Sequence, residues 1–585
     1  MSNSRKYDTW SVTLRILGLI RPYRAVFGTT VFLVIALAIL APLRPWLIQF
    51  TVDGPIAEFD KEGLWRMTMF MVLILVIESI FRYGFSYWSA WLGQQAIHDL
   101  RNTLFKKLLQ KRLRFFDKTP IGTMTTRTVS DIETIAEVFS QGLLTIVGDV
   151  LQLFAILAVM LHEDWRLTLI SLSVLPLLLY STYVFKEKVR ISLQEIRNEV
   201  ARLNAFVQEH ISGMRIVQLF SRQAEEKRRF EEVNGALNRA NLKSVMYYSV
   251  FFPVVEIITA ASLGLLVWYG AGAALKEELT VGVIIAFILY VNQFFRPIRL
   301  LADKFNSLQM GVVASERVFR LLELQEEVAD TGTALIEKPQ GAVSFDNVWF
   351  GYDAEQMVLK GITFSAQPGK KIALVGPTGA GKSSVINVLG RYYEYQQGEV
   401  TLDGIAIRDL PLATIQKHIG VVLQDVFLFS GTIADNISMF NDAVSHELMM
   451  DMARLSGIDR FINKLPLGLK TPVGERGGFL STGQRQLVAF LRVMVYNPTV
   501  VVLDEATASI DSETEEILQT ALKKVLENRT SIIIAHRLST ITDADEILVI
   551  EDGQIAERGT HKELMSQKGH YQALYALQLA QEKSE

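Results

Sequence analysis

Six long apolar stretches in the first half of the chain limit most strongly what it can fold into. They cover residues 25–50, 65–92, 138–161, 166–185, 246–272 and 280–300. A hydrocarbon layer of about 30 Å needs roughly 20 apolar residues in helical form. Six such runs are unusual for buried helices of a soluble protein, and the mean hydropathy of +0.24 agrees with a membrane protein. We therefore predict an α-helical domain with six membrane spans.

Basic residues predict how these spans are oriented, because lysine and arginine concentrate in cytoplasmic loops. The N-terminal segment is basic and lacks a small-residue cleavage site, so we expect no cleavable signal peptide. The two long connections between spans are also basic, through Arg101, Lys106, Lys107, Lys111, Arg112 and Arg114 and through Lys186, Lys188, Arg190, Arg197 and Arg202. We expect a multi-pass protein of the inner or plasma membrane with both termini cytoplasmic. The long connections should be helical extensions of the spans.

The pattern of apolar and polar residues changes after the sixth span. Residues 341–585 alternate short β-rich runs with polar helices, and the polar, acidic stretch 321–340 resembles a linker. We therefore divide the chain into a membrane domain (1–320), a linker (321–340) and an α/β domain (341–585). The chain has no cysteine, which excludes disulfides and thiolate metal sites. Its net charge of −3 decides nothing about a nucleic-acid partner, and we expect none.

The α/β domain carries a complete phosphate-binding loop motif, GPTGAGKS, from Gly376 to Ser383. It follows an apolar strand and opens an apolar helix, which is the context that this motif requires. Glycines let backbone N–H groups surround phosphate oxygens, and the helix N-terminus favours negative charge. Lys382 should contact the β- and γ-phosphates of a nucleotide, and Ser383 should bind Mg²⁺. The predicted nucleotide contacts of this loop are Gly376, Thr378, Gly379, Gly381, Lys382, Ser383 and Ser384.

A second apolar strand ends in two acids, Asp504 and Glu505. The carboxyl end of a buried parallel strand is where ligands of such sheets bind. Asp504 should hold Mg²⁺, and Glu505 should orient or deprotonate the attacking water.

Further motifs around these two make the resemblance specific. Leu480–Gln484 (LSTGQ) is similar to the LSGGQ signature of ABC ATPases, and Ala508–Asp511 is similar to the D-loop of that family. Gln424, His536 and Tyr352 match its Q-loop glutamine, switch histidine and adenine-stacking aromatic residue. The resemblance implies that ATP and Mg²⁺ are the cofactors and that Glu505, His536 and Gln424 are catalytic. It also places Gln424 on the metal, and Tyr352, Ser481, Gly483, Gln484 and Asp511 on the nucleotide.

The membrane half resembles ABC exporters as well. Phe115–Gly122, with Arg127 and Asp131, is similar to the first cytoplasmic coupling segment of that family, and Glu209–Gly213 begins a segment similar to the second. The resemblance implies a half-transporter, because in this family the signature of one chain completes the ATP site of another. We prefer a homodimer. A heterodimer stays open because Thr482 stands where the signature usually has glycine and could crowd the phosphate.

The transported compound is left open by the sequence. The resemblance implies a small amphipathic or hydrophobic cargo, such as a drug or a lipid, and the alternative is an importer with the exporter fold. A soluble ABC ATPase is disfavoured by the six spans, and a regulator without hydrolysis is disfavoured by Glu505. Charged residues within the predicted spans either line a polar translocation cavity or lie in cytoplasmic extensions; they are Arg44, Glu78, Arg82, Asp149, Glu256 and Arg296.

Overall fold

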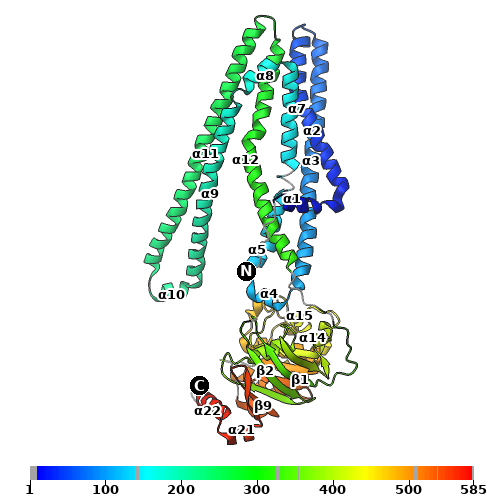
Figure 1. The fold of residues 1–585 in the computed structure, drawn as a ribbon, viewed down its shortest axis with the longest axis vertical. Coiled ribbons are helices and arrows are strands. Elements are labelled where there is room, and N and C mark those ends of the chain that lie inside the picture. Colours follow the sequence, from blue (N-terminus) through cyan, green and yellow to red (C-terminus); the bar gives the residue numbers. More distant parts are fainter. Residues whose placement is uncertain are drawn as a thin grey trace. The chain divides into compact units, whose positions relative to one another are not determined.

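The computed structural model describes residues 9–138, 142, 144–324, 330, 332–353, 355–504, 511–535 and 538–582. These residues form two compact units (Figure 1). The first unit, here called the membrane unit, comprises Met1–Leu109 and Pro120–Gln325. The second, the nucleotide unit, comprises Glu326–Glu585 together with the short segment Gln110–Thr119. That segment lies between the second and third predicted spans, so the chain enters the nucleotide unit twice.

Long helices make up the membrane unit. They are α2 (Arg24–Thr51), α3 (Lys61–Leu109), α7 (Leu144–Glu163), α8 (Trp165–Leu172), α9 (Leu175–Ser212), α11 (Gln223–Ala274) and α12 (Val281–Glu323). Short helices connect or flank them: α1 (Thr9–Gly18), η1 (Arg21–Tyr23), η2 (Val52–Ile56), α5 (Ile121–Thr128), α6 (Ser130–Glu137) and α10 (Met214–Leu219). Among the described residues, six segments are long and apolar enough to cross a membrane, which confirms the six predicted spans.

The connections between spans follow the predicted pattern. The polar break between the third and fourth spans is a tight hairpin, in which the Asp164 carboxylate accepts the backbone N–H of Leu167 at 2.5 Å and caps α8. The two long connections are helical, because α3, α9 and α11 continue far beyond their apolar parts. Helices α9 and α11 form a long antiparallel pair joined by α10 (Figure 1).

Four charged side chains inside the predicted spans form ion pairs. Arg82 donates to Glu78 at 2.7 Å, one turn away on α3, so these two residues share a helix face. Arg44 of α2 lies 3.8 Å from the other oxygen of Glu78. Lys304 of α12 donates to Asp149 of α7. Charges that must stay in a membrane are costly unless they are paired or hydrated, so these pairs lower the cost of burying them.

Two sheets form the centre of the nucleotide unit. The antiparallel sheet has the order β2-β1-β4-β5, and the larger sheet has the order β10-β9-β3-β8-β7-β6. The strands are β1 (Val343–Phe350), β2 (Leu359–Ala366), β3 (Lys371–Val375), β4 (Gln397–Leu402), β5 (Ile405–Ala406), β6 (Ile419–Val422), β7 (Val500–Asp504), β8 (Thr530–Ile534), β9 (Glu546–Glu551) and β10 (Gln554–Gly559). Strands β9, β3, β8, β7 and β6 are parallel, so their carboxyl ends meet at one edge.

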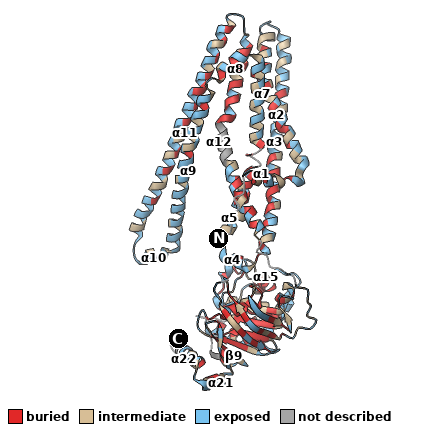
Figure 2. Ribbon diagram, viewed as in Figure 1, coloured by how far each residue is buried: buried red, intermediate tan, exposed pale blue. Residues whose placement is uncertain are grey.

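Helices pack around these sheets and bury them, as Figure 2 shows by the red strands of the nucleotide unit. They are α4 (Leu113–Lys118), α13 (Lys382–Leu389), α14 (Leu412–His418), α15 (Ile433–Ser438), α16 (His446–Ser456), α17 (Asp459–Lys464), η4 (Gly468–Lys470), η5 (Glu475–Gly477), α18 (Thr482–Tyr496), α19 (Ser512–Leu526), α20 (Leu538–Thr542), α21 (His561–Gln567) and α22 (His570–Glu582). Strand β3 is fully apolar after Lys371 and buried, as expected for a parallel strand that is covered on both faces. The predicted fold class, six spans followed by an α/β domain, is confirmed.

Candidate functional site

The phosphate-binding loop connects β3 to α13 at the carboxyl edge of the larger sheet. Gly376 starts the loop with φ of +152°, and a Cβ there would lie 2.1 Å from the carbonyl oxygen of Ile550. A side chain at this position would therefore collide with strand β9. Gly381 caps the N-terminus of α13 in a left-handed conformation, with φ of +106°. The loop thus exposes the N-terminal N–H groups of α13, which is a favourable environment for phosphate.

Lys382, the first residue of α13, places its ammonium group inside this loop. Its Nζ donates to the carbonyl oxygens of Gly376 at 2.7 Å and Pro377 at 2.9 Å. The side chain is only 7% exposed. Burial lowers the pKa of this ammonium group, and the nearby Asp504 carboxylate opposes that effect. The charge is held where phosphate oxygens would enter the loop.

A pocket of about 430 Å³ opens beside the loop. It brings together most of the predicted site, because its lining includes Tyr352, Thr378, Gly379, Gly381, Lys382, Ser383, Ser384, Gln424 and Asp504. These residues come from the loop after β3, from α13 and β7, and from the segments after β1 and β6, which lie far apart in the sequence. Their convergence results from the strand order, since β3 and β7 both flank β8.

Other predicted residues lie away from this lining or outside the described chain. Gly376 shapes the loop without lining the pocket, and Ser481, Gly483, Gln484 and Asp511 do not line it. Asp511 caps α19 by accepting the backbone N–H of Thr514 at 2.9 Å, and this hydrogen bond lowers its pKa. Glu505, which directly follows β7, and His536, two residues after the end of β8, lie outside the described residues.

Tyr352 is anchored through its hydroxyl group. Asn387 donates to this hydroxyl at 2.9 Å, and the hydroxyl lies 3.2 Å from Ser384 Oγ. The ring also packs edge-on against Phe350 and Tyr393. The tyrosine is therefore fixed at the pocket wall, with Ser384 as a partner of its hydroxyl group.

The signature residues form the N-terminus of α18. Ser481 Oγ accepts the backbone N–H of Gln484 at 3.2 Å, and Gln484 Oε1 accepts the backbone N–H of Ser481 at 3.0 Å. This reciprocal pair is a capping box, which fixes where the helix begins. Thr482 is the first helical residue and does not have a positive φ, so its position does not require glycine. Its hydroxyl accepts a hydrogen bond from Arg485 at 3.1 Å.

The pocket lining suits a nucleotide-bound magnesium ion. Mg²⁺ in nucleotide sites is held by one or two protein oxygen ligands together with phosphates. Ser383 supplies a hydroxyl, Gln424 an amide oxygen and Asp504 a carboxylate, and all three line the same pocket. The donor set is therefore compatible with the predicted metal.

One half-buried arginine was missed by the sequence interpretation. Arg492 of α18 donates to the carbonyl oxygens of Asn436 at 2.6 Å and Phe427 at 3.2 Å. Asn436 in turn donates to Phe429 O at 2.9 Å. Burial lowers the pKa of Arg492. This network ties the segment that follows Gln424 to the helix that begins with the signature. The single charged residue in the otherwise apolar stretch 487–496 was the available signal.

A second group of missed residues surrounds α4, the helix of the first coupling segment. Lys118 Nζ lies 2.7 Å and Arg114 lies 3.3 Å from Asp353 Oδ1, next to Tyr352 in the sequence. The Lys118 hydrogen bond is the main reason that the pKa of Asp353 is lowered. Tyr393 donates its hydroxyl to Asp117 of α4. Its ring stands at 88° to that of Tyr352, with the centroids 4.9 Å apart.

Comparisons with known proteins agree with these features. The family model "ABC transporter transmembrane region" matches residues 27–298, and the model "ABC transporter" matches residues 359–508. A probable multidrug resistance ABC transporter ATP-binding/permease protein of Bacillus subtilis is 37% identical over 92% of this chain and 81% of its own. An ATP-dependent lipid A-core flippase of Thiobacillus denitrificans is 33% identical over 97% of this chain and 98% of its own.

A solved structure has the same architecture. A bacterial Atm1-family ABC exporter with ATP bound superposes with a TM-score of 0.75 and 28% identity, over 96% of this chain and 98% of that one. The relatives named here are exporters or flippases, so the importer alternative is not favoured. This chain therefore belongs to the ABC transporter family, as an exporter-type half-transporter in which the membrane region and the ATP-binding domain are fused.

Proposed function

We propose that this chain hydrolyses ATP and uses the energy to export or flip small amphipathic compounds, such as drugs or lipids, across the cell membrane. The observation that carries the proposal is the position of α4. This helix is continuous in sequence with α3, a membrane span, yet it belongs to the nucleotide unit and contacts Asp353 and Tyr393 beside Tyr352. A change at the nucleotide pocket can therefore reach a membrane helix through a few side chains.

In the proposed site, the loop N–H groups and Lys382 bind the phosphates, and Tyr352 offers its ring to the adenine base. Mg²⁺, when bound by Ser383, Gln424 and Asp504, neutralises charge that develops on the phosphates. Glu505 orients or deprotonates the attacking water, and His536 holds that water near the γ-phosphate. The roles of Glu505 and His536 are supported by the family motifs. The roles of the other residues are supported by the pocket geometry.

The active form should be a dimer, with a homodimer as the preferred state. Ser481, Gly483 and Gln484 begin α18 but do not line the pocket that holds Lys382. A helix N-terminus favours phosphate, so these residues are suited to the nucleotide of a second half-transporter. Asp511, at the start of α19, would support the same interface. Thr482 adopts a helical backbone without strain, which supports a working site in a homodimer.

The proposed orientation places the nucleotide unit and both termini in the cytoplasm. The basic long connections support it through the distribution of lysine and arginine. The cargo class rests on the relatives, two of which are named for multidrug resistance and lipid A-core flipping. An amphipathic compound fits a membrane unit whose helices expose many apolar side chains.

The test is Glu505→Gln in the full chain, reconstituted in proteoliposomes. We expect ATP hydrolysis to fall by a factor on the order of 10² or more, because a general base contributes about 10²–10⁴, while ATP binding persists. Glu515→Gln on α19 is the matched control and should keep normal turnover. Near-normal hydrolysis by the Glu505 variant would remove that residue from the catalytic role. Hydrolysis without movement of dyes or lipids by the unchanged protein would contradict transport.

A further inference from the structure

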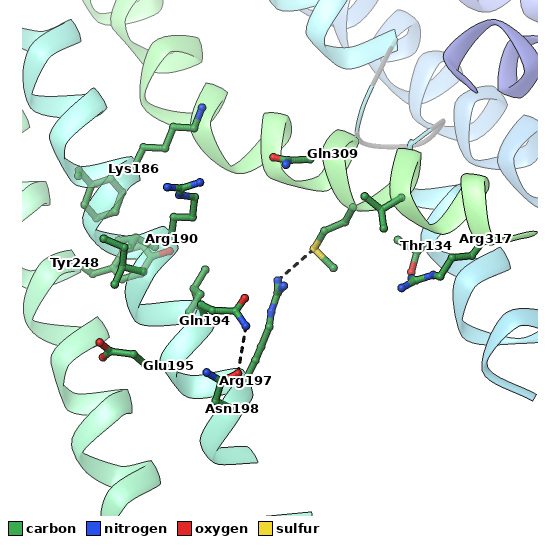
Figure 3. A pocket seen from close by; sticks show the side chains of 16 residues that line it. Thr134, Lys186, Arg190, Gln194, Glu195, Arg197, Asn198, Tyr248, Gln309 and Arg317 are labelled. Carbon is green, nitrogen blue, oxygen red and sulfur yellow. Dashed lines mark hydrogen bonds between the residues drawn. The ribbon is translucent and has the colours of Figure 1, made fainter. Parts of the chain in front are cut away.

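A cavity of about 650 Å³ lies between α9, α11, α12 and α6 of the membrane unit. Figure 3 shows its polar side chains, with Lys186, Arg190 and Arg197 along α9 and Gln309 on the facing α12. Four of the five charged residues in the lining are cationic. The cavity is separate from the nucleotide pocket, and none of the motifs described above accounts for it.

The cationic residues of α9 share one face. Lys186, Arg190 and Arg197 fall within about 40° around the helix axis and span about 16 Å along it, given 3.6 residues and 5.4 Å per turn. Lys186 directly follows the predicted span 166–185. These cations therefore begin at the edge of the apolar layer and continue away from it. In the proposed orientation this edge is cytoplasmic, where the phosphates of lipid headgroups lie.

The other two charged side chains of the cavity already have an ion-pair partner. Arg317 donates to Asp131 at 2.6 Å, and Glu195 accepts from Lys243 at 2.8 Å. Arg190 and Arg197 of α9 differ. Arg190 contacts Glu187 on its own helix at 2.5 Å, and its side chain is 70% exposed. Such exposed pairs contribute little, so Arg190 can exchange this carboxylate for a ligand. Arg197 donates to the sulfur of Met310 at 3.7 Å, which is a weak acceptor.

The rest of the lining is suited to an amphipathic ligand. Gln194, Asn198 and Gln309 add amide groups that can donate hydrogen bonds, and Phe185, Val189, Leu193 and Val313 add apolar surface. Phe185 is held by stacking on Phe251 with ring centroids 3.8 Å apart. Guanidinium groups bind phosphate through paired hydrogen bonds. The cavity thus combines phosphate-binding groups with an apolar wall.

We propose that this cavity binds the phosphate group of an amphipathic ligand, with Arg190 and Arg197 as its main contacts. The inference rests on the proposed function, which makes this end of α9 cytoplasmic, and it narrows the cargo to phosphate-bearing compounds. The phosphate could belong to a membrane lipid or to a soluble compound. Both sources have the same recognition chemistry, and they are distinguished by experiment.

The experiment measures equilibrium binding of spin-labelled phosphatidic acid to the full chain in phosphatidylcholine nanodiscs without ATP. Arg190→Gln/Arg197→Gln should weaken binding about tenfold or more, since hydrogen bonds to charged groups are worth that factor. Arg190→Lys/Arg197→Lys should bind more tightly than the double glutamine variant and more weakly than the unchanged protein, because it keeps the charge but loses the paired hydrogen bonds of the guanidinium groups. Lys188→Gln is the matched control. Lys188 lies on the same helix, about 180° from this face, and lines a different groove. It should change binding by less than about twofold.

The outcomes separate the possibilities. Equal binding by the unchanged protein and the double glutamine variant, or an equal loss in the Lys188 variant, would overturn the proposal. Displacement of phosphatidic acid by millimolar inorganic phosphate would support a soluble phosphate compound, and its absence would support a lipid headgroup. If phosphatidic acid does not bind at all, the proposal is overturned. ATP hydrolysis is measured in parallel. Hydrolysis without phosphate binding rejects only this inference, whereas binding without hydrolysis rejects only the proposed function.

Discussion

The nucleotide pocket contains the cation Lys382, and the cavity lined by Lys186, Arg190 and Arg197 of the membrane unit, here called the basic cavity, contains several. The two sites hold their cations differently. Lys382 is 7% exposed and donates to two carbonyl groups of its own loop. Arg190 is on a long helix, is 70% exposed and contacts Glu187 of the same helix. A buried and fixed charge selects one ligand geometry, whereas long exposed side chains can adapt to several. This difference agrees with the proposed roles, in which one pocket binds a single nucleotide and the other cavity binds phosphate-bearing compounds of different shapes.

The strongest test of this comparison removes the fixed charge. Lys382→Ala should lower ATP hydrolysis by about 10²–10³, the size of effect seen when one preorganised electrostatic group is deleted from an active site. Binding of phosphatidic acid without ATP should stay unchanged, because the basic cavity belongs to the other unit. Both are measured on the same nanodisc preparation. Lys523→Ala, an exposed lysine on α19, is the control for charge. A parallel loss of phosphatidic acid binding would show that the two sites are not independent.

A smaller effect is expected where the rest of the nucleotide unit contacts α4. Tyr393→Phe removes the hydrogen bond to Asp117, which as a bond to a charged group is worth about 1.5–3 kcal/mol. Transport per ATP hydrolysed should fall on the order of tenfold, while hydrolysis itself changes little. Burial and the hydrogen bond to Asp117 both raise the pKa of Tyr393, so the hydroxyl stays protonated and donates at neutral pH.

The control for this variant is Tyr395→Phe, which removes a hydroxyl whose contact, the backbone N–H of Val400, lies on β4 and not on α4. Simultaneous assays of dye or lipid movement and phosphate release give the ratio. An unchanged ratio in the Tyr393 variant, or an equal fall in the Tyr395 variant, would argue against α4 as the coupling element.

The smallest effect is expected at Thr482. Its backbone is helical, so Thr482→Gly should relieve no strain and should destabilise the start of α18 by about 0.5–1 kcal/mol. ATP turnover should change by less than about threefold, and the melting temperature should fall slightly. Thr520→Gly, within α19, gives the reference cost of glycine in a helix. A rise in turnover of tenfold or more would revive the view that threonine crowds the phosphate and weakens the site.

Local sequence motifs indicated that residues of the phosphate-binding loop would lie beside Tyr352, Gln424 and Asp504, because phosphate binding depends on backbone geometry that few sequences can adopt. Gly376 illustrates this, since any side chain there would meet the carbonyl of Ile550. The six spans were equally predictable from length and apolar composition. Arg492, Tyr393 and Asp353 were not, because each works through a partner far away in the sequence. Nothing near Asp353 indicates that Lys118, 235 positions earlier, will bind it.

The sequence by itself determined the six-span architecture, the ATP-binding domain and the residues that form its phosphate loop. Tertiary structure alone decided which unit contains α4 and which cations face a common cavity. The physical reason is the range of the interactions involved. Hydrophobic periodicity and loop conformation are properties of neighbouring residues. A cavity between α9 and α12, or the packing of α4 within the nucleotide unit, exists only after distant segments have packed together.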